Sequence, residues 1–159
     1  MNYFIIEFPE SNESIRFDLL TEKAPKTCEA FWEVISEPVE MMVKHAIYTG
    51  KEISAQLPPD GKAKDLLYDP KPENLTCFPL PGDILFTFMP EYGFGGAPVP
   101  IFDIGVFYGR DARTFFPMGW LPGHLMAQVH SKQELDRLQE VGQSIHVNGQ
   151  QPMVIRRGE

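Results

Sequence analysis

The chain has 159 residues, of which 43% are hydrophobic and 23% charged, and its formal net charge is −8. This length and composition fit one globular domain over residues 1–159 and exclude long disorder. The acidity argues against nucleic-acid binding, which needs clustered Lys and Arg, and against docking on anionic lipid. No apolar run approaches the roughly 20 residues that span a bilayer, so neither nucleic acid nor a membrane is an expected partner.

Cys28 and Cys77 are the only cysteines of the chain. They do not form a CxxC pair, and two thiols alone cannot build a metal cluster. The first residues lack the basic segment of a secretory signal. We therefore expect reduced thiols in a cytoplasmic protein, with no cofactor and no bound metal.

The first part of the chain predicts a hairpin followed by a helix. Residues 3–8 are rich in strand-forming residues and residues 15–19 alternate apolar and polar side chains, so these segments predict two paired strands. Over residues 24–36 apolar side chains recur every three or four positions, which predicts a helix. Pro25 suits its first turn, and Pro38 follows its end.

The central part of the chain predicts mainly strands. They are expected at residues 39–48, 52–56, 84–88, 101–108, 125–129 and 151–157. Residues 57–79 form a long connection rich in Pro, Asp and Lys. Connections of this length are often functional or mobile, and the pattern leaves open whether this one folds over a groove as a lid. Residues 115–123 are expected to form an aromatic loop.

Residues 131–142 predict a second helix. Ser131 and Glu134 have the spacing of a capping box, in which the hydroxyl accepts a hydrogen bond from the third helical residue and the carboxylate reaches back. Gly142 is expected to end the helix. Many short strands with two helices predict a mostly β fold, a closed antiparallel eight-stranded barrel whose ends are covered by the helices near 24–36 and 131–142.

Four stretches resemble segments of cyclophilins and occur in the cyclophilin order. They are residues 24–31 (APKTCEAF, beside PKTxxNF), 45–54 (HAIYTGKEIS, beside HRxIPGFMxQ), 106–108 (VFY, beside QFF) and 120–124 (WLPGH, beside WLDGxH). The chain is therefore identified as cyclophilin-like. Its HAxYTGxE and PGDxLF segments are most similar to a bacterial family of uncharacterised cyclophilin-like proteins, from which no activity carries over.

The resemblance implies an altered isomerase groove. At the positions of the cyclophilin Arg, Phe, Met and Gln this sequence has Ala46, Lys51, Glu52 and Ser54. Rotation of a prolyl amide has a barrier of about 18–20 kcal/mol, and a cationic donor lowers it by stabilising the single-bonded nitrogen. Ala46 cannot donate. We therefore expect little or no prolyl isomerase activity, and whether the chain is an enzyme stays open.

The replaced positions suggest a polar pocket with aromatic walls for a small polar ligand. The residues expected in or near it are His45, Tyr48, Lys51, Glu52, Phe107, Trp120 and His124. No catalytic residue is assigned. His45 has a second interpretation as an interior histidine with satisfied hydrogen bonds.

Several alternatives remain at this stage. Glu52 and His124 could act as an acid–base pair, or could join His45 in a metal site with two histidines and one carboxylate. The chain could also be a divergent peptidyl-prolyl isomerase, or a binder of proline peptides. Its aromatic and Met content is compatible with a structural homo-oligomer as well.

Overall fold

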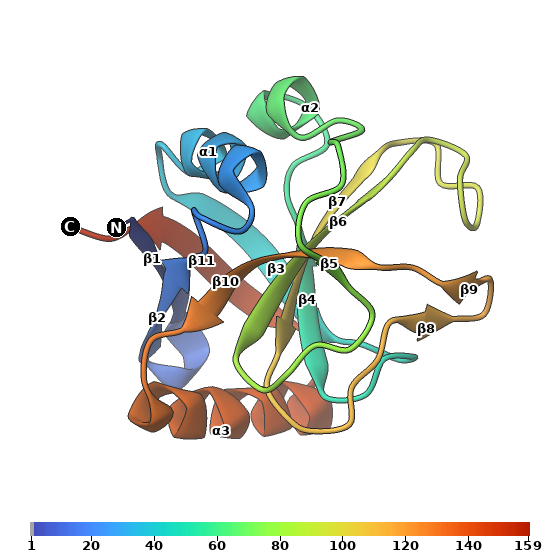
Figure 1. Cartoon of the computed structure of the whole chain (residues 1–159). Helices are drawn as coiled ribbons and strands as arrows, with labels where there is room; N and C mark the ends of the chain where they lie inside the picture. The colour runs from blue at the N-terminus through green and yellow to red at the C-terminus, as the bar shows by residue number, and fades with distance from the viewer. Residues whose placement is uncertain (1) are drawn as a thin grey trace.

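Eight strands pair in a ring, as the alternating segments of the sequence predict (Figure 1). In the computed structural model, which describes residues 2–159, β2 (Glu13–Leu19) pairs with β1 (Tyr3–Phe8) on one side and β10 (Gly123–Val129) on the other, so the antiparallel sheet closes. From β1 to β10 the ring continues through β11 (Gln151–Arg157), β3 (Val39–His45), β4 (Glu52–Gln56), β7 (Ile101–Phe107) and β6 (Asp83–Met89). The predicted barrel is confirmed.

Side chains that point into the ring form the main core. In β1 every second residue is buried, beginning with Phe4. The centre of the Phe4 ring lies 5.6 Å from that of Phe17 on β2 and 5.0 Å from that of Phe31. Because Phe31 belongs to α1 (Pro25–Val34), this aromatic cluster joins the barrel wall to a helix that covers one end of the barrel.

Helix α1 confirms the predicted helix over residues 24–36, but it begins one residue later, at Pro25, and ends two residues earlier, at Val34. The first N–H groups of a helix have no partner within it. Here the Glu73 carboxylate accepts hydrogen bonds from the backbone N–H groups of Lys26 (3.1 Å) and Thr27 (2.8 Å). The connection over residues 57–79 therefore caps α1.

The same connection contains two short elements that the sequence did not predict. Helix α2 (Lys62–Leu66) packs against α1, and β5 (Leu75–Thr76) pairs with β10. The predicted aromatic loop likewise contains a small hairpin of β8 (Phe115–Phe116) and β9 (Gly119–Trp120). A 3₁₀ turn (Pro9–Ser11) joins β1 to β2.

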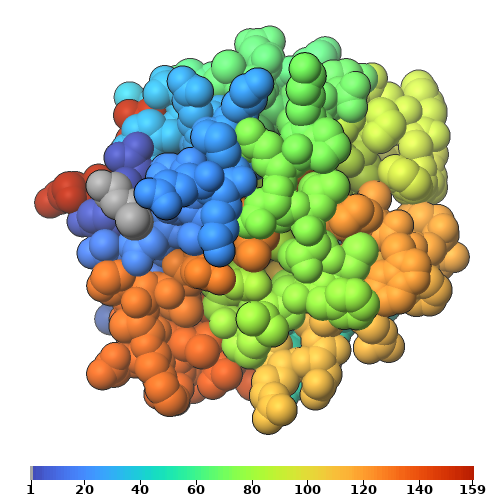
Figure 2. All heavy atoms as spheres, in the orientation of Figure 1, coloured from blue at the N-terminus to red at the C-terminus, as the bar shows by residue number. Residues whose placement is uncertain are grey.

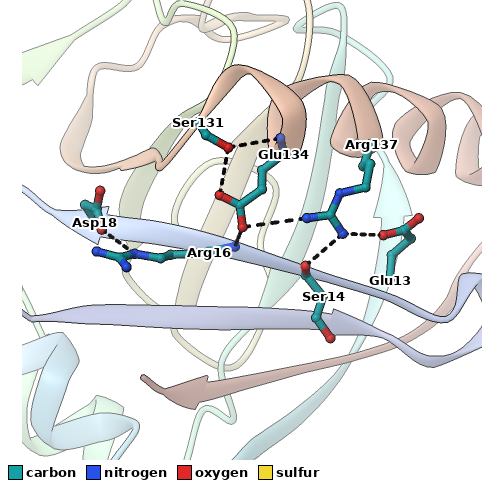
Figure 3. A network of polar contacts seen from close by, with 7 residues as sticks. All are labelled: Glu13, Ser14, Arg16, Asp18, Ser131, Glu134 and Arg137. Carbon is teal, nitrogen blue, oxygen red and sulfur yellow. Dashed lines mark hydrogen bonds and ion pairs between the residues drawn. The ribbon is translucent and has the colours of Figure 1, made fainter. Parts of the chain in front are cut away.

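Helix α3 (Lys132–Asn148) covers the other end of the barrel (Figure 1). Its capping differs from the prediction. Ser131 accepts a hydrogen bond from the Glu134 N–H, but the Glu134 carboxylate accepts from the Arg16 N–H (2.9 Å) and the Ser131 hydroxyl (3.1 Å) instead of reaching back to the backbone (Figure 3). With an ion pair between Arg137 and Glu13 (2.7 Å), this network ties α3 to β2.

The prediction that Gly142 ends α3 is wrong. The helix continues to Asn148, and its C-cap is Gly149, whose φ of 91° lies in the left-handed region that favours glycine. Gly142 is buried inside the helix, where an added Cβ would lie 2.5 Å from the Tyr108 ring. A glycine is needed there for close packing and not for the end of the helix. No helix among residues 2–159 is long and apolar enough to cross a membrane.

Gly142→Ala is expected to destabilise the protein, because the new Cβ collides with the Tyr108 ring. Overpacking of this kind typically costs about 1–3 kcal/mol, whereas Gly→Ala at an exposed helical site gains about 1 kcal/mol. Urea unfolding measures the difference, with Gln143→Ala at the neighbouring exposed position as the control. A gain in stability for Gly142→Ala would show that the helix moves away from Tyr108 at little cost.

Candidate functional site

The outer wall of the barrel contains a pocket with a volume of about 280 Å³. Strand alternation separates it from the core: Phe86 on β6 and Val106 on β7 point inward, while Leu85 and Phe107 form a second cluster outside. The lining comes from β3, β4, β6, β7 and the segments around them: Lys44, His45, Ala46, Ile47, Tyr48, Thr49, Glu52, Ser54, Leu85, Thr87, Met89, Asp103, Phe107, Thr114, Phe116 and Leu121.

Glu52 is a buried carboxylate in this lining, with only 7% of its surface exposed. Gly50, whose φ is 97°, turns the chain between β3 and β4 and brings Thr49 close to Glu52. The Thr49 hydroxyl donates a hydrogen bond of 2.5 Å to Oε1 of Glu52. The other oxygen, Oε2, occupies the space that a Cβ on Gly105 would need. The absence of a side chain at Gly105 therefore makes room for this carboxylate.

Asp103 places a second carboxylate in the same pocket, from the neighbouring strand β7. Burial, followed by the charge of Asp103, raises the pKa of Glu52 to about 8 against the opposing hydrogen bond from Thr49. Burial also raises the pKa of Asp103, to about 7, while the Lys44 ammonium acts in the opposite direction. The two carboxyl groups therefore exchange protons with solvent near neutral pH.

Aromatic and aliphatic side chains form the walls around these carboxylates. The Tyr48 and Phe116 rings lie edge to face with 6.5 Å between their centres, and Phe107 and Leu85 pack together in the same lining. Thr114 is 4% exposed, and its hydroxyl has no hydrogen-bond partner among the described residues. Apolar walls with a few polar groups are typical of sites for small ligands.

His45 lines the pocket with both ring nitrogens already bonded. Nδ1 lies 2.8 Å from the Ala46 carbonyl oxygen and Nε2 lies 2.6 Å from the Tyr108 hydroxyl. A carbonyl only accepts, so Nδ1 carries the hydrogen and Tyr108 donates to Nε2. Burial and the nearby His146, whose ring stacks at 4.2 Å, lower the pKa of His45 and keep it neutral. The arrangement matches the interior histidine of the second interpretation.

The structure brings together four of the seven residues expected from the sequence: His45, Tyr48, Glu52 and Phe107 line the pocket. Lys51 is exposed and lies over Gly109. Trp120 is exposed on β9, where it contacts Phe115 and Phe78 at 4.9 and 5.4 Å between ring centres. The hairpin that carries Trp120 lies at the right-hand edge of the molecule in Figure 2.

His124 lies on the opposite side of the barrel wall from Glu52. In β10 the neighbouring Leu125 packs in the outer cluster, so alternation points His124 inward, beside Phe86. It is 8% exposed, its Nδ1 lies 3.3 Å from the Phe86 carbonyl oxygen, and burial lowers its pKa. The hypothetical Glu52–His124 pair is therefore not assembled.

No group of three His, Cys, Asp or Glu side chains within residues 2–159 could hold a metal ion. The hypothetical site of His45, His124 and Glu52 is consequently not assembled either. None of residues 57–79 lines the pocket, so in this structure the long connection is not its lid.

Sequence reasoning missed Asp103 and Gly105. A signal for both was present, because they lie four and two residues before Phe107 in a predicted strand and so share its face. A charged residue and a glycine on the outer face of an otherwise apolar strand indicate a site. Thr49 and Thr114 lie in irregular segments, and no comparable periodicity marked them.

Glu52→Gln is expected to remove a pH-dependent loss of stability. An acid whose pKa is raised on folding gives stability that is fully present below its unfolded pKa, near 4.5, and is lost as pH rises through about 8. Between about pH 5 and pH 9 the free energy of unfolding of the wild type should fall by a few kcal/mol more than that of the variant. Urea unfolding at each pH measures this. As a control, Glu40→Gln changes an exposed residue of β3 and should show the same pH dependence of unfolding as the wild type. A wild-type pH dependence in Glu52→Gln would contradict the prediction.

Gly105→Ala tests the space under the carboxylate. The new Cβ would collide with Oε2 of Glu52, so we expect a destabilisation of about 1–3 kcal/mol. In a Glu52→Ala background the same change should cost much less, because the colliding group is gone. Thermal and urea unfolding of the four proteins in this cycle measure the coupling. Additive effects would show that Gly105 is needed for another reason.

Solved structures of low sequence identity share the fold. McbB in complex with tryptophan has a TM-score of 0.71 at 18% identity, over 98% of this chain but only 45% of McbB, so this chain spans less than half of that protein. The hypothetical protein AF2241 from Archaeoglobus fulgidus has a TM-score of 0.57 at 17% identity, over 99% and 95% of the two chains. The Mimivirus cyclophilin has a TM-score of 0.54 at 12% identity, over 99% and 88%. At these identities the likeness establishes the cyclophilin-like fold alone.

No curated protein matches the chain in sequence. Residues 6–156 match the family described as Protein of unknown function (DUF3830). Because the match spans nearly the whole chain, and the barrel resembles a cyclophilin, the protein is a cyclophilin-like member of the DUF3830 family.

Proposed function

We propose that the protein binds a small polar ligand in the outer pocket and lacks ordinary prolyl isomerase activity. The observation that carries this proposal is the buried carboxylate of Glu52, at the position where the resemblance implies an apolar wall of a proline site. A proline ring gains most from an apolar surface, and burial of an unpaired carboxylate beside it is unfavourable. A ligand with polar groups would bond to this carboxylate.

Within residues 2–159, the absence of an arginine from the pocket lining supports the proposed lack of prolyl isomerase activity. Ala46 lines the pocket at the Arg position of the isomerases and has no donor in its side chain. Lys51, five residues further along the chain, lies outside the pocket over Gly109. Lys44 lines the pocket but is exposed, and its ammonium is a flexible point charge rather than the planar donor of an arginine.

Two further observations favour a small molecule as the ligand. McbB, of which 45% shares this fold, is solved in complex with tryptophan, and this makes amino acids a class of compound to test here. The Thr114 hydroxyl is buried without a partner in the lining, and such a group gains free energy when a ligand supplies a hydrogen bond.

A cytoplasmic location, with Cys28 and Cys77 as reduced thiols, is part of the same proposal.

A homo-oligomer is the second candidate, favoured by the exposed aromatic cluster beside the pocket. Phe78, Phe115 and Trp120 contact one another and remain largely exposed. Clusters of this kind often mark interaction surfaces. Sedimentation of the full chain tests it, since a concentration-dependent dimer would bury these rings, and a Trp120→Ser variant should then be monomeric.

We expect no isomerase activity above background on Xaa-Pro peptides and a rise in melting temperature with a small polar compound. Magnetisation exchange on a proline peptide measures the first, with an active cyclophilin as the positive control. A thermal-shift screen over metabolites, metals and proline peptides measures the second, because a ligand at about 100 times its Kd stabilises the folded state by about 2.7 kcal/mol.

The two assays separate the candidate functions. Isomerase activity comparable to that of the control cyclophilin would refute the proposal, and so would stabilisation by proline peptides alone. A compound that stabilises the wild type but not Glu52→Gln would assign its binding to the outer pocket.

A further inference from the structure

The floor of the outer pocket holds two carboxylates that no cation of the protein neutralises by direct contact. None of the ion pairs among residues 2–159 includes Glu52 or Asp103. Thr49 bonds to Oε1 of Glu52, while Oε2 and the Asp103 carboxylate accept no hydrogen bond from any described residue. Glu52 is buried and Asp103 is half-buried. Carboxylates withdrawn from water in this way are normally paired or hydrogen-bonded, so these free oxygens in the pocket lining are open to a partner outside the chain.

We infer that this floor binds the ammonium group of a small organic cation, whose apolar part contacts the aromatic and aliphatic walls. The inference rests on the proposed function, because it names the class of ligand for the same pocket. An ammonium group has three donors and no acceptor. Glu52, Asp103 and the hydroxyls of Ser54 and Thr114 all belong to the lining and offer it oxygen atoms.

The charges that face the two carboxylates favour a cation over an anion. From β3 they are Lys44, which is exposed, and His45, which is neutral because burial and the nearby His146 lower its pKa. The connection between β3 and β4 contributes only the Tyr48 phenol, and the lining from β6 and from residues 114–121 contains no titratable group. An anionic ligand would therefore meet two carboxylates against one mobile lysine.

The walls favour an organic cation over a metal ion. Phe107, Phe116 and Leu85 supply apolar surface that a metal ion would not use, and no third metal-binding side chain completes a site with the two carboxylates among the described residues. Aromatic rings also attract an ammonium group through their negative faces. The volume of about 280 Å³ suits a compound with one ring or a short aliphatic chain.

Ligand binding should release protons, because the carboxylates are partly protonated near neutral pH when the pocket is empty. An ammonium ion beside them favours their charged forms, and the displaced protons go to the buffer. The affinity for an ammonium compound should therefore rise from about pH 6 to pH 9, while the compound itself stays protonated. The affinity for a neutral analogue should not rise.

The test compares three probes of one shape by calorimetry at about pH 8: 2-phenylethylammonium, 2-phenylethanol and 3-phenylpropionate. We expect the ammonium compound to bind at least about tenfold more tightly than the alcohol, since a hydrogen bond to a charged group is worth about 1.5–3 kcal/mol. The propionate should bind most weakly. Titrations in phosphate and in Tris, whose ionisation enthalpies differ, count the protons released.

Variants of the pocket residues test whether Glu52 and Asp103 cause the preference for the ammonium compound. Glu52→Gln and Asp103→Asn should each reduce the preference for the ammonium compound and the proton release, while Glu40→Gln on the exposed face of β3 should change neither. Lys44→Met removes the one competing cation of the lining and should tighten ammonium binding. If the carboxylates served only as partners of Lys44, the same change would weaken binding and destabilise the fold.

The binding results distinguish a failure of the ammonium inference from a failure of the proposed function. Equal or tighter binding of the alcohol or the propionate overturns the ammonium inference and leaves the proposed pocket in place. Failure of all three probes, with stabilisation by another class of compound in the thermal-shift screen, also overturns it. Failure of every compound in that screen overturns the proposed function instead.

Discussion

The pairing of β2 with β10 is the contact on which the rest of the structure depends. It closes the sheet, and closure assigns every second side chain of each strand to the inside or the outside of the barrel. The inside becomes the main core. The outside is left to residues that the fold does not need for its core, and there Leu85 and Phe107 form a second, smaller cluster. The pocket exists because this outer cluster does not cover the whole wall.

Glu52 lies on the outer face of the barrel, where a residue can lower the stability of the fold without disturbing the main core. A carboxyl group with 7% exposure and a pKa near 8 destabilises the folded state at neutral pH. The neighbourhood nevertheless accommodates it, with a hydroxyl from Thr49 on one oxygen and an empty position at Gly105 beneath the other. Groups with strongly shifted pKa values and specific supports of this kind cluster at functional sites. The resemblance implies an apolar side chain at this position in the isomerase groove, which is why we propose a different chemistry on a cyclophilin-like fold.

Sequence periodicity was sufficient for the barrel because each strand carries its own inside–outside pattern. The resemblance to cyclophilins, and not the periodicity, implied that His45, Glu52 and Phe107 share one site, as the pocket lining bears out. It was insufficient for His124, which belongs to a recognisable segment but points into the core, since a motif identifies a position along a strand and not always the face. The sequence pattern also wrongly predicted that α3 ends at Gly142. The glycine is needed beside the Tyr108 ring, which is distant in sequence.

The sequence by itself determined the closed barrel and the two helices that cover its ends, because these follow from local patterns, and its resemblance to cyclophilins implied Ala46 at the position of the isomerase arginine. Only the tertiary structure decided that Glu52 and Asp103 share one pocket, that Lys51 and Trp120 lie outside it and that residues 57–79 cap α1 instead of covering it. The physical reason is that burial, charge pairing and pKa depend on neighbours from other strands. Those neighbours are set when the ring closes.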